Sequence, residues 1–131
     1  MKTRTGVMTL LGAALFLLVQ ATAANAAGDA AAGEKLFKAK CALCHSNQAG
    51  VNRVGPSSFG TIGRVVGTVP GYNYSEALKT MSKKGQKWDA AMLDGWLTNP
   101  KAVASGTKMA FVGLSAKKDR DDVIAYLAKL K

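Results

Sequence analysis

The chain has 131 residues, two cysteines, one histidine and a formal net charge of +10. This length allows one small domain and excludes a multidomain enzyme. The positive charge favours acidic protein surfaces, anionic lipid or nucleic acid as partners.

Residues 1–26 are predicted to be a signal peptide that is cleaved from the mature protein. Lys2 and Arg4 precede an apolar run over residues 7–19, and Ala24-Asn25-Ala26 offers the small residues that a signal peptidase requires. An uncleaved membrane anchor is the alternative, but the apolar run is shorter than the roughly 20 residues that span a bilayer. We therefore expect a periplasmic protein that has no stable membrane insertion and no nucleic acid as partner.

Residues 27–131 are predicted to form one domain with a thin hydrophobic core. Loss of Lys2 and Arg4 lowers the formal net charge from +10 to +8. Leu, Ile, Val and Phe make up roughly a fifth of this segment, which is little for a charged chain that must fold. Small domains of this kind usually need a disulfide, a metal or a cofactor. A large apolar cofactor would supply the missing core.

Helical patterns lie at both ends of the domain and in its middle. The first helix is expected to begin after Asp29, a possible N-cap, and to run toward the cysteines. A short helix is expected over residues 75–81, and a longer one begins after Asp89 and ends before Pro100. The last begins at Ser115, a capping residue, and has one apolar face made by Val123, Ile124, Leu127 and Leu130.

The segment 50–74 is rich in glycine and has no strand pattern. So long an irregular stretch is unusual within a compact domain. It is reasonable if the loop wraps around a rigid group, because glycine lets the backbone come close. We therefore predict an all-α fold whose helices are joined by loops that enclose a cofactor.

Both cysteines and the only histidine lie in one motif, CALCH, formed by Cys41, Cys44 and His45. A thioredoxin-like site requires a strand before the first cysteine, whereas the residues before Cys41 have a helical pattern. A structural zinc site requires four ligands, and this chain offers three. A disulfide between the two cysteines would leave the histidine unexplained.

Covalent attachment of haem accounts for all three residues at once. The two thiols would form thioethers with the haem vinyl groups, and the adjacent imidazole would bind the iron. We therefore predict one haem c per chain, attached covalently through Cys41 and Cys44, with His45 as an axial ligand. The export signal agrees, because this attachment takes place outside the bacterial cytoplasm.

A methionine is the natural candidate for the other axial position, because the chain has no second histidine. Met81, Met92 and Met109 remain after the signal peptide is removed. Met92 lies in a helical pattern with core residues, and Met81 ends a short helix. Met109 lies in a loop, where ligands are common, so position favours Met109 without excluding the other two.

The sequence resembles the class I c-type cytochromes, mitochondrial cytochrome c and bacterial cytochrome c-two among them. The resemblance spans residues 27–131 and rests on motifs that follow one another in the same order: CALCH, VGPSSFGTIGR, GYNYS, KKGQKW, WLTNPKAVASGTKMAFVG and RDDVIAYL. It implies a small cytochrome c fold, in which the N- and C-terminal helices pack together and loops wrap the covalently bound haem. Gly33 and Phe37 on the first helix would meet Val123 and Tyr126 on the last.

The resemblance also implies roles for further residues. Met109 would be the sixth ligand, and the carbonyl of Pro56 would accept a hydrogen bond from His45 and so fix its tautomer. Trp96 would pack beside the methionine. The partners of the haem propionates would be Arg64, Tyr74, Ser75, Trp88 and Thr107. In a plainer interpretation, the aromatic residues are ordinary members of the hydrophobic core and Arg64 is a solvent-exposed charge.

The chain departs from the family pattern at three positions. Ser58 and Phe59 stand where many relatives have leucine and histidine, which suggests altered packing near the haem with Phe59 compensating. Ser105 replaces a proline that usually precedes GTKM. The loop of Met109 is therefore expected to be less rigid and its methionine easier to displace.

Two axial ligands leave the iron no position for a substrate, so one-electron transfer is expected rather than catalysis. Lys40 and Lys108 directly precede Cys41 and Met109, and the resemblance adds Lys101 to this basic surface. The surface would steer the protein, as a monomer, to acidic faces of membrane redox complexes. These would be a quinol-oxidising complex and a terminal oxidase or photosynthetic reaction centre.

Other functions remain open. The protein could instead accept electrons from a dedicated periplasmic dehydrogenase. A haem peroxidase or gas sensor requires an open or easily opened sixth position, which only the less rigid methionine loop favours. A small thiol oxidoreductase would leave His45 and the thin core unexplained.

Overall fold

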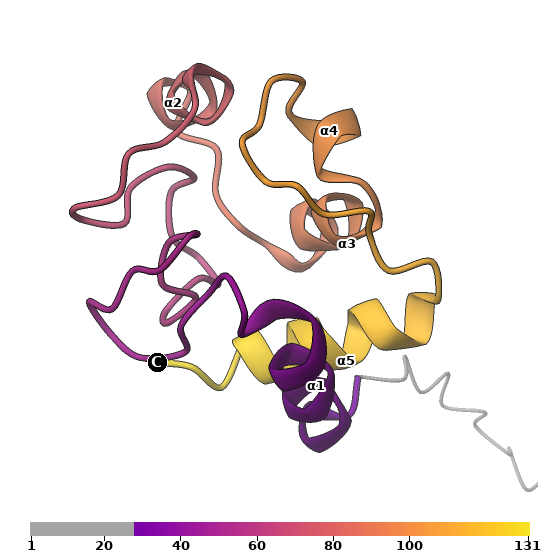
Figure 1. Cartoon of the computed structure of the whole chain (residues 1–131). Helices are drawn as coiled ribbons and strands as arrows, with labels where there is room; N and C mark the ends of the chain where they lie inside the picture. The colour runs from indigo at the N-terminus through magenta and orange to yellow at the C-terminus, as the bar shows by residue number, and fades with distance from the viewer. Residues whose placement is uncertain (1–27) are drawn as a thin grey trace, which may run out of the picture.

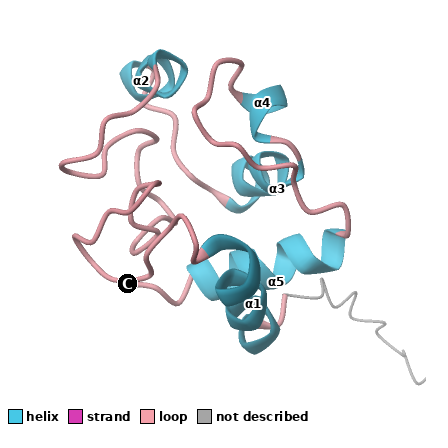
Figure 2. Ribbon diagram, in the orientation of Figure 1, coloured by secondary structure: helices cyan, strands magenta, loops and turns pink. Residues whose placement is uncertain are grey.

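The computed structural model describes residues 28–131 and shows helices joined by long loops (Figures 1 and 2). The predicted signal peptide lies outside the described residues. Within them, strand-like pairing is limited to one isolated antiparallel bridge between Val65 and Lys87. None of the helices in this part of the chain is long and apolar enough to span a membrane. The predicted all-α class is confirmed.

Five α-helices and one π-helical turn make up the regular structure of residues 28–131. In chain order they are α1 (Ala30–Leu36), the π-helical turn (Phe37–Cys41), α2 (Glu76–Lys83), α3 (Ala90–Thr98), α4 (Pro100–Val103) and α5 (Lys117–Leu127). Two predicted N-caps are confirmed, because the side chains of Asp29 and Asp89 accept hydrogen bonds from amides in the first turns of α1 and α3. Ser75, which the sequence did not single out as a cap, caps α2 in the same way.

Of two predictions about helix ends, one is confirmed and one is wrong. α3 ends at Thr98, before Pro100, as predicted, and Pro100 begins a separate short helix, α4, which the Asn99 side chain caps. A proline suits this first position because its missing N–H needs no partner. The predicted cap at Ser115 is absent, because α5 begins at Lys117 after Ala116, which makes no side-chain capping bond.

A buried arginine holds the start of α5 in place of a cap. The Arg120 guanidinium donates to the carbonyls of Leu114 and Ser115, at 2.8 Å each, and to the carboxylate of Asp94 on α3, also at 2.8 Å. An arginine can be buried when its donors are matched in this way. Arg120 therefore joins α5, α3 and the loop between them.

The first and last helices cross at close range, as Figure 1 shows at its lower edge. Gly33 is buried at the crossing, and a Cβ placed there would lie 1.9 Å from the carbonyl oxygen of Asp122. Next to it the rings of Phe37 and Tyr126 pack with their centroids 5.4 Å apart. Val123 is buried in the same cluster. The expected meeting of these four side-chain positions is confirmed.

Two clusters of buried residues form the core. The first joins α3 and α5 to the π-helical turn: Phe37, Leu93, Leu97, Leu114, Val123, Tyr126 and Leu127. The second gathers around α2: Val66, Val69, Tyr74, Leu78, Met81, Trp96 and Ala104. Trp88 packs against both clusters. The remaining space at their junction is a cavity.

Candidate haem site

Members of both core clusters line a cavity of about 380 Å³, a size within the range of cofactor sites. Every site residue predicted from the sequence lies in its lining except Lys101, which is exposed on α4. The predicted residues in the lining are Lys40, Cys41, Cys44, His45, Pro56, Arg64, Tyr74, Ser75, Trp88, Trp96, Thr107, Lys108 and Met109. Residues far apart in the chain therefore meet at one site.

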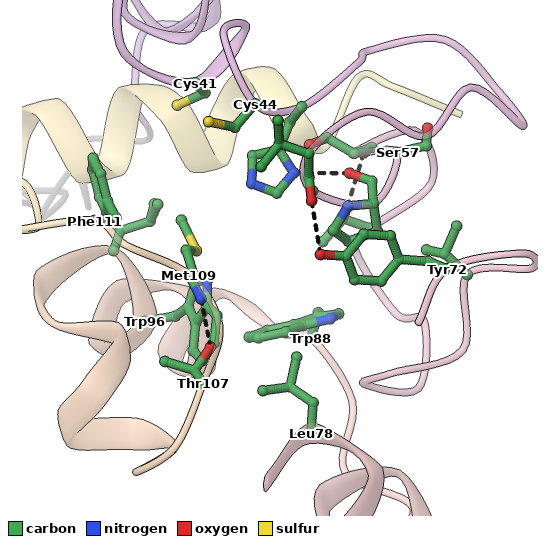
Figure 3. Close-up of a pocket in the computed structure, with 18 of the residues that line it drawn as sticks. Cys41, Cys44, Ser57, Tyr72, Leu78, Trp88, Trp96, Thr107, Met109 and Phe111 are labelled. Atoms are coloured by element: carbon green, nitrogen blue, oxygen red, sulfur yellow. Dashed lines mark hydrogen bonds between the residues drawn. The ribbon is translucent and has the colours of Figure 1, made fainter. Parts of the chain in front are cut away.

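The two cysteines lie on a tight turn that ends the first helical segment. The amides of Cys44 and His45 both donate to the carbonyl of Cys41, at 3.0 and 2.9 Å. Figure 3 shows the two sulfur atoms close to one another at the wall of the cavity. No disulfide joins the two cysteines. They are positioned to react with the same group.

The electrostatics of Cys41 do not suit a redox dithiol. Burial, with a smaller contribution from Cys44, raises the pKa of the Cys41 thiol to about 11. A thiol oxidoreductase requires a lowered pKa, because the thiolate is the nucleophile. The geometry agrees, since the preceding residues form a helical turn and not a strand.

The imidazole of His45 is held in one tautomer. Its Nδ1 lies 2.8 Å from the carbonyl oxygen of Pro56. A carbonyl oxygen only accepts, so Nδ1 carries the proton and Nε2 keeps its lone pair for a metal. Gly55 makes this possible, because a Cβ there would lie 2.3 Å from the ring. Sequence reasoning missed Gly55, although the GP dipeptide drew attention to its neighbour Pro56.

Met109 faces the cysteines from another wall of the cavity. Its amide donates to the hydroxyl of Thr107 at 3.2 Å, and Figure 3 shows its side chain directed toward the two thiols. Met81 is buried in the second cluster and Met92 packs against that cluster. Among the methionines of residues 28–131, Met109 alone lines the cavity. This placement favours the methionine that sequence position also favoured.

Four of the predicted propionate partners also have structural contacts of their own. The Arg64 guanidinium donates to the carbonyl of Phe59, and the Tyr74 hydroxyl accepts from the amide of Val69 at 3.1 Å. Burial raises the pKa of the Tyr74 phenol. Ser75 caps α2, and the ring of Trp88 meets that of Trp96 edge to face at 5.1 Å. These residues pack the protein in addition to lining the cavity.

The departures from the family pattern have different outcomes. Ser58 is half-buried and lines the cavity, with its amide donating to the carbonyl of Ser46 at 2.8 Å. Phe59 is half-buried and is not part of the lining, so any compensation for Ser58 by its ring would have to come from outside the cavity. Ser105 is exposed in the turn before Thr107. The turn is closed by a hydrogen bond from the amide of Thr107 to the carbonyl of Ala104 at 3.0 Å.

Several lining residues carried no signal in the sequence. Tyr72 donates from its hydroxyl to the carbonyl of Val54 at 2.9 Å, and this bond joins two loops at the cavity edge. Leu78 and Phe111 line other parts of the wall (Figure 3). Leucine and phenylalanine are common in any hydrophobic core, so the sequence alone does not indicate that these two residues line the cavity.

The residues present fit a covalently bound haem. Two neighbouring thiols, an imidazole with a free Nε2 and a thioether line one largely apolar cavity within a helical domain. These features define a c-type haem protein. The family model described as cytochrome c matches residues 30–131.

Individual relatives agree with the family match. The chain is 51% identical over 104 residues to the cytochrome c of Euglena viridis, which covers 79% of this chain and 99% of that protein. It is 48% identical over 124 residues to the cytochrome c2 of Rhodomicrobium vannielii, covering 92% of each. Among solved structures, cytochrome cH from Methylobacterium extorquens has a TM-score of 0.69 at 48% identity and covers 77% of this chain and 98% of its own.

The chain therefore belongs to the cytochrome c family. Its cofactor is covalently attached haem c, and Cys41 and Cys44 provide the two cysteines of the attachment motif. Members of this family transfer electrons and are not enzymes. The fold, the cofactor and the absence of catalysis follow from this membership.

Proposed function

We propose that the protein is a periplasmic one-electron carrier whose haem iron is bound by His45 and Met109. When bound, haem supplies a one-electron change between ferric and ferrous iron. Cys41 and Cys44 hold it covalently, and the Pro56 carbonyl keeps Nε2 of His45 available for the metal. The observation that supports this proposal is that His45 and Met109 line the same cavity, whereas Met81 and Met92 are not in its lining.

The remaining cavity residues would bind and shield the group. Arg64, Tyr74 and Ser75 bring polar side chains to the cavity lining, where they could be partners of the haem carboxylates. Trp88 and Thr107 belong to the same proposed set, and Trp96 would pack beside Met109. A dry, rigid surrounding keeps the two oxidation states similar in structure, which favours fast transfer. With His45 and Met109 both bound to the iron, no position would remain for a substrate.

The basic surface supports a role as a mobile carrier. Lys40 and Lys108 are exposed and line the cavity, and Lys101 is exposed on α4. Acidic faces of membrane redox complexes would attract this surface, speed association and still allow rapid release. The donor would be a quinol-oxidising complex or a dedicated dehydrogenase, and the acceptor a terminal oxidase or a photosynthetic reaction centre. The predicted signal peptide over residues 1–26 is the reason for a periplasmic location.

A redox titration combined with carbon monoxide tests this proposal. The exported protein should titrate as a single one-electron step, and the spectrum of its ferrous form should not change under carbon monoxide. The Met109→Ala variant, with its sixth position opened, should bind carbon monoxide. Binding by the wild-type protein would instead favour a sensor or peroxidase, with the methionine loop around Ser105 as its cause.

A further inference from the structure

Residues 52–58 run beside residues 42–46, the segment that includes Cys44 and His45, and bond to it at four successive places. The four bonds are between 2.7 and 2.8 Å long, and in chain order the bonded pairs are Arg53 with Ala42, Gly55 with Cys44, Pro56 with His45 and Ser58 with Ser46. The two segments therefore lie in register along their length. We refer to residues 52–58 as the clamp.

The clamp holds the carbonyl group that determines the tautomer of His45. This carbonyl belongs to Pro56, and the residues on either side of Pro56 both have bonded amides. The amide of Gly55 donates to the CALCH motif, and the amide of Ser57 donates to the side-chain oxygen of Asn52 at 3.0 Å. Ser57 is only 4% exposed. The Pro56 carbonyl therefore cannot turn away from the imidazole unless a neighbouring hydrogen bond breaks.

The side chain of Asn52 ties the clamp to a second loop. Its Oδ1 accepts from the amide of Ser57, and its Nδ2 donates to the carbonyl of Pro70 at 2.9 Å. An asparagine amide carries both an acceptor and donors, and here the two ends of one side chain serve two segments. Asn52 thus fixes the end of the clamp that follows Pro56 and holds it against the loop of Pro70.

The side chain of Arg53 ties the other end of the clamp to the attachment motif. Its guanidinium donates to the carbonyl of Ala42, which lies between the two cysteines. Its own amide donates to the carbonyl of Gly55 at 2.9 Å, which closes the turn before Pro56. Arg53 forms no ion pair within residues 28–131. Its charged head therefore serves this carbonyl, and hydrogen bonds of a charged donor are stronger than neutral ones.

We propose that Asn52 and Arg53 are positioning residues for the axial ligand, because they hold the Pro56 carbonyl against His45 through the clamp. This inference rests on the proposed ligation of the iron by His45. Neither side chain lines the cavity, so both act through the clamp and not by contact with the haem. A hydrogen bond from the second ring nitrogen raises the basicity of a ligating imidazole. A more basic ligand favours ferric over ferrous iron, so the clamp lowers the reduction potential.

The proton on Nδ1 of His45 reports on the clamp directly. It exchanges with water only after it has left the Pro56 carbonyl, so local opening of the clamp determines its exchange rate. In the ferric protein the unpaired electron of the iron shifts the resonances of a bound imidazole away from those of other groups. Loss of one typical intramolecular hydrogen bond favours the open state roughly fivefold.

The test is the exchange rate of this proton, measured by NMR in the exported ferric haem protein. We expect exchange roughly fivefold faster than in the wild type for both Asn52→Ala and Arg53→Met. Asn52→Asp keeps the acceptor for the Ser57 amide and should stay close to the wild type. The matched control is Asn47→Ala, which removes an asparagine bond of the same loop, to the Tyr126 hydroxyl at 2.9 Å, and should exchange at the wild-type rate.

The reduction potential of Asn52→Ala is a second readout, because this variant changes no charge. The ratio of ferrous to ferric protein at a fixed potential should increase about threefold, which is a rise of about 28 mV for a one-electron couple. The potential of Arg53→Met is not used in this way, since loss of a positive charge would itself favour ferric iron.

The outcomes are distinguishable. The inference is overturned, with the carrier function intact, if Asn52→Ala and Arg53→Met lose stability but keep the wild-type exchange rate. It is also overturned if Asn47→Ala accelerates exchange as much as they do, or if Asn52→Asp is as fast as Asn52→Ala. If the His45 ring of the wild-type ferric protein shows no shift caused by the iron, His45 is not a ligand and the proposed function itself fails.

Discussion

Glycine allows a close approach both at the helix crossing and at the cavity wall, but the two approaches have different consequences. At the crossing, Gly33 brings α1 so close to α5 that a Cβ would lie 1.9 Å from the Asp122 carbonyl. At the wall, Gly55 brings a loop against the ring of His45, where a Cβ would lie 2.3 Å away. At the crossing, atoms of α1 and α5 fill the space between the two helices. The loop closes only one side of a space that the cofactor is needed to fill.

This difference shows which half of the molecule depends on the cofactor. The crossing is completed by the ring pair of Phe37 and Tyr126 and by the Arg120 contacts to α3. The loops over residues 46–74 and 104–114 surround the cavity, and the side chains that they bury belong mainly to the second cluster, beside that cavity. Since both core clusters also face that cavity, haem would join them into one core.

The largest expected effect comes from removing the attachment of the cofactor. The double variant Cys41→Ser, Cys44→Ser, which cannot form thioethers, should fail to reach a stable fold, because the thin core would be left with an unfilled cavity. Far-ultraviolet circular dichroism of the exported protein and a haem stain on a denaturing gel measure this. If the double variant instead showed a full helical signal and a cooperative thermal transition without haem, that result would contradict the claim that the loops need the cofactor to fold.

The next effect breaks the crossing itself. Gly33→Ala places a methyl group against backbone that cannot turn aside, and we expect a loss of about 3 kcal/mol in the free energy of unfolding. Denaturant titration followed by tryptophan fluorescence measures it. Gly95→Ala on α3 is the matched control, because its Cβ would meet Val103 at an ordinary 3.5 Å. The control should be neutral or slightly stabilising; equal losses in both variants would remove the special role of the crossing.

Arg120 gives a smaller effect where α5 meets α3. Arg120→Met should cost about 2 kcal/mol, because the carbonyls of Leu114 and Ser115 and the Asp94 carboxylate lose their donors. The comparison variant is Lys79→Met, which removes only the exposed pair with Glu76 and should change stability by less than about 0.5 kcal/mol. If the two variants unfold at the same denaturant concentration, the buried arginine does not stabilise the contact between α5 and α3.

The smallest effect is a pH dependence at the crossing. Hydrogen bonds from Lys118, and then from the Asp29 amide, lower the pKa of Asp122, and Asp122 in turn raises the pKa of Lys118. The lowered carboxyl pKa contributes stability above its ordinary value near 3.8, which is lost as pH falls through the folded value. The raised ammonium pKa contributes stability below 10.5, lost as pH rises past its folded value.

Thermal melts of Asp122→Asn against pH test this linkage. The melting temperature should lie below that of the wild type by a constant amount near neutral pH, and the difference should shrink toward acid. Asp119→Asn, a change on the same helix outside this hydrogen-bonded group, serves as the control. A difference that stays constant down to strong acid would mean that the Asp122 contacts do not depend on its charge.

The sequence predicts the parts of this molecule that local pattern or motif chemistry determines. CALCH identified the covalent site because no other use of two cysteines accounts for the adjacent histidine, and the caps at Asp29 and Asp89 follow from side-chain chemistry within one turn. Gly55, Tyr72 and Arg120 could not be found in this way. Each acts through a contact with a segment far along the chain, and such contacts exist only once the loops have closed.

The axial ligation of the iron is the central claim, and the optical spectrum of the ferric protein tests it most directly. The wild type should show the weak far-red band that ferric haem has with methionine sulfur. Met109→Leu should lose this band while keeping the reduced α band of thioether-linked haem, and Met81→Leu and Met92→Leu should keep both. A far-red band that persists in Met109→Leu, or that is absent from the wild type, would contradict the account.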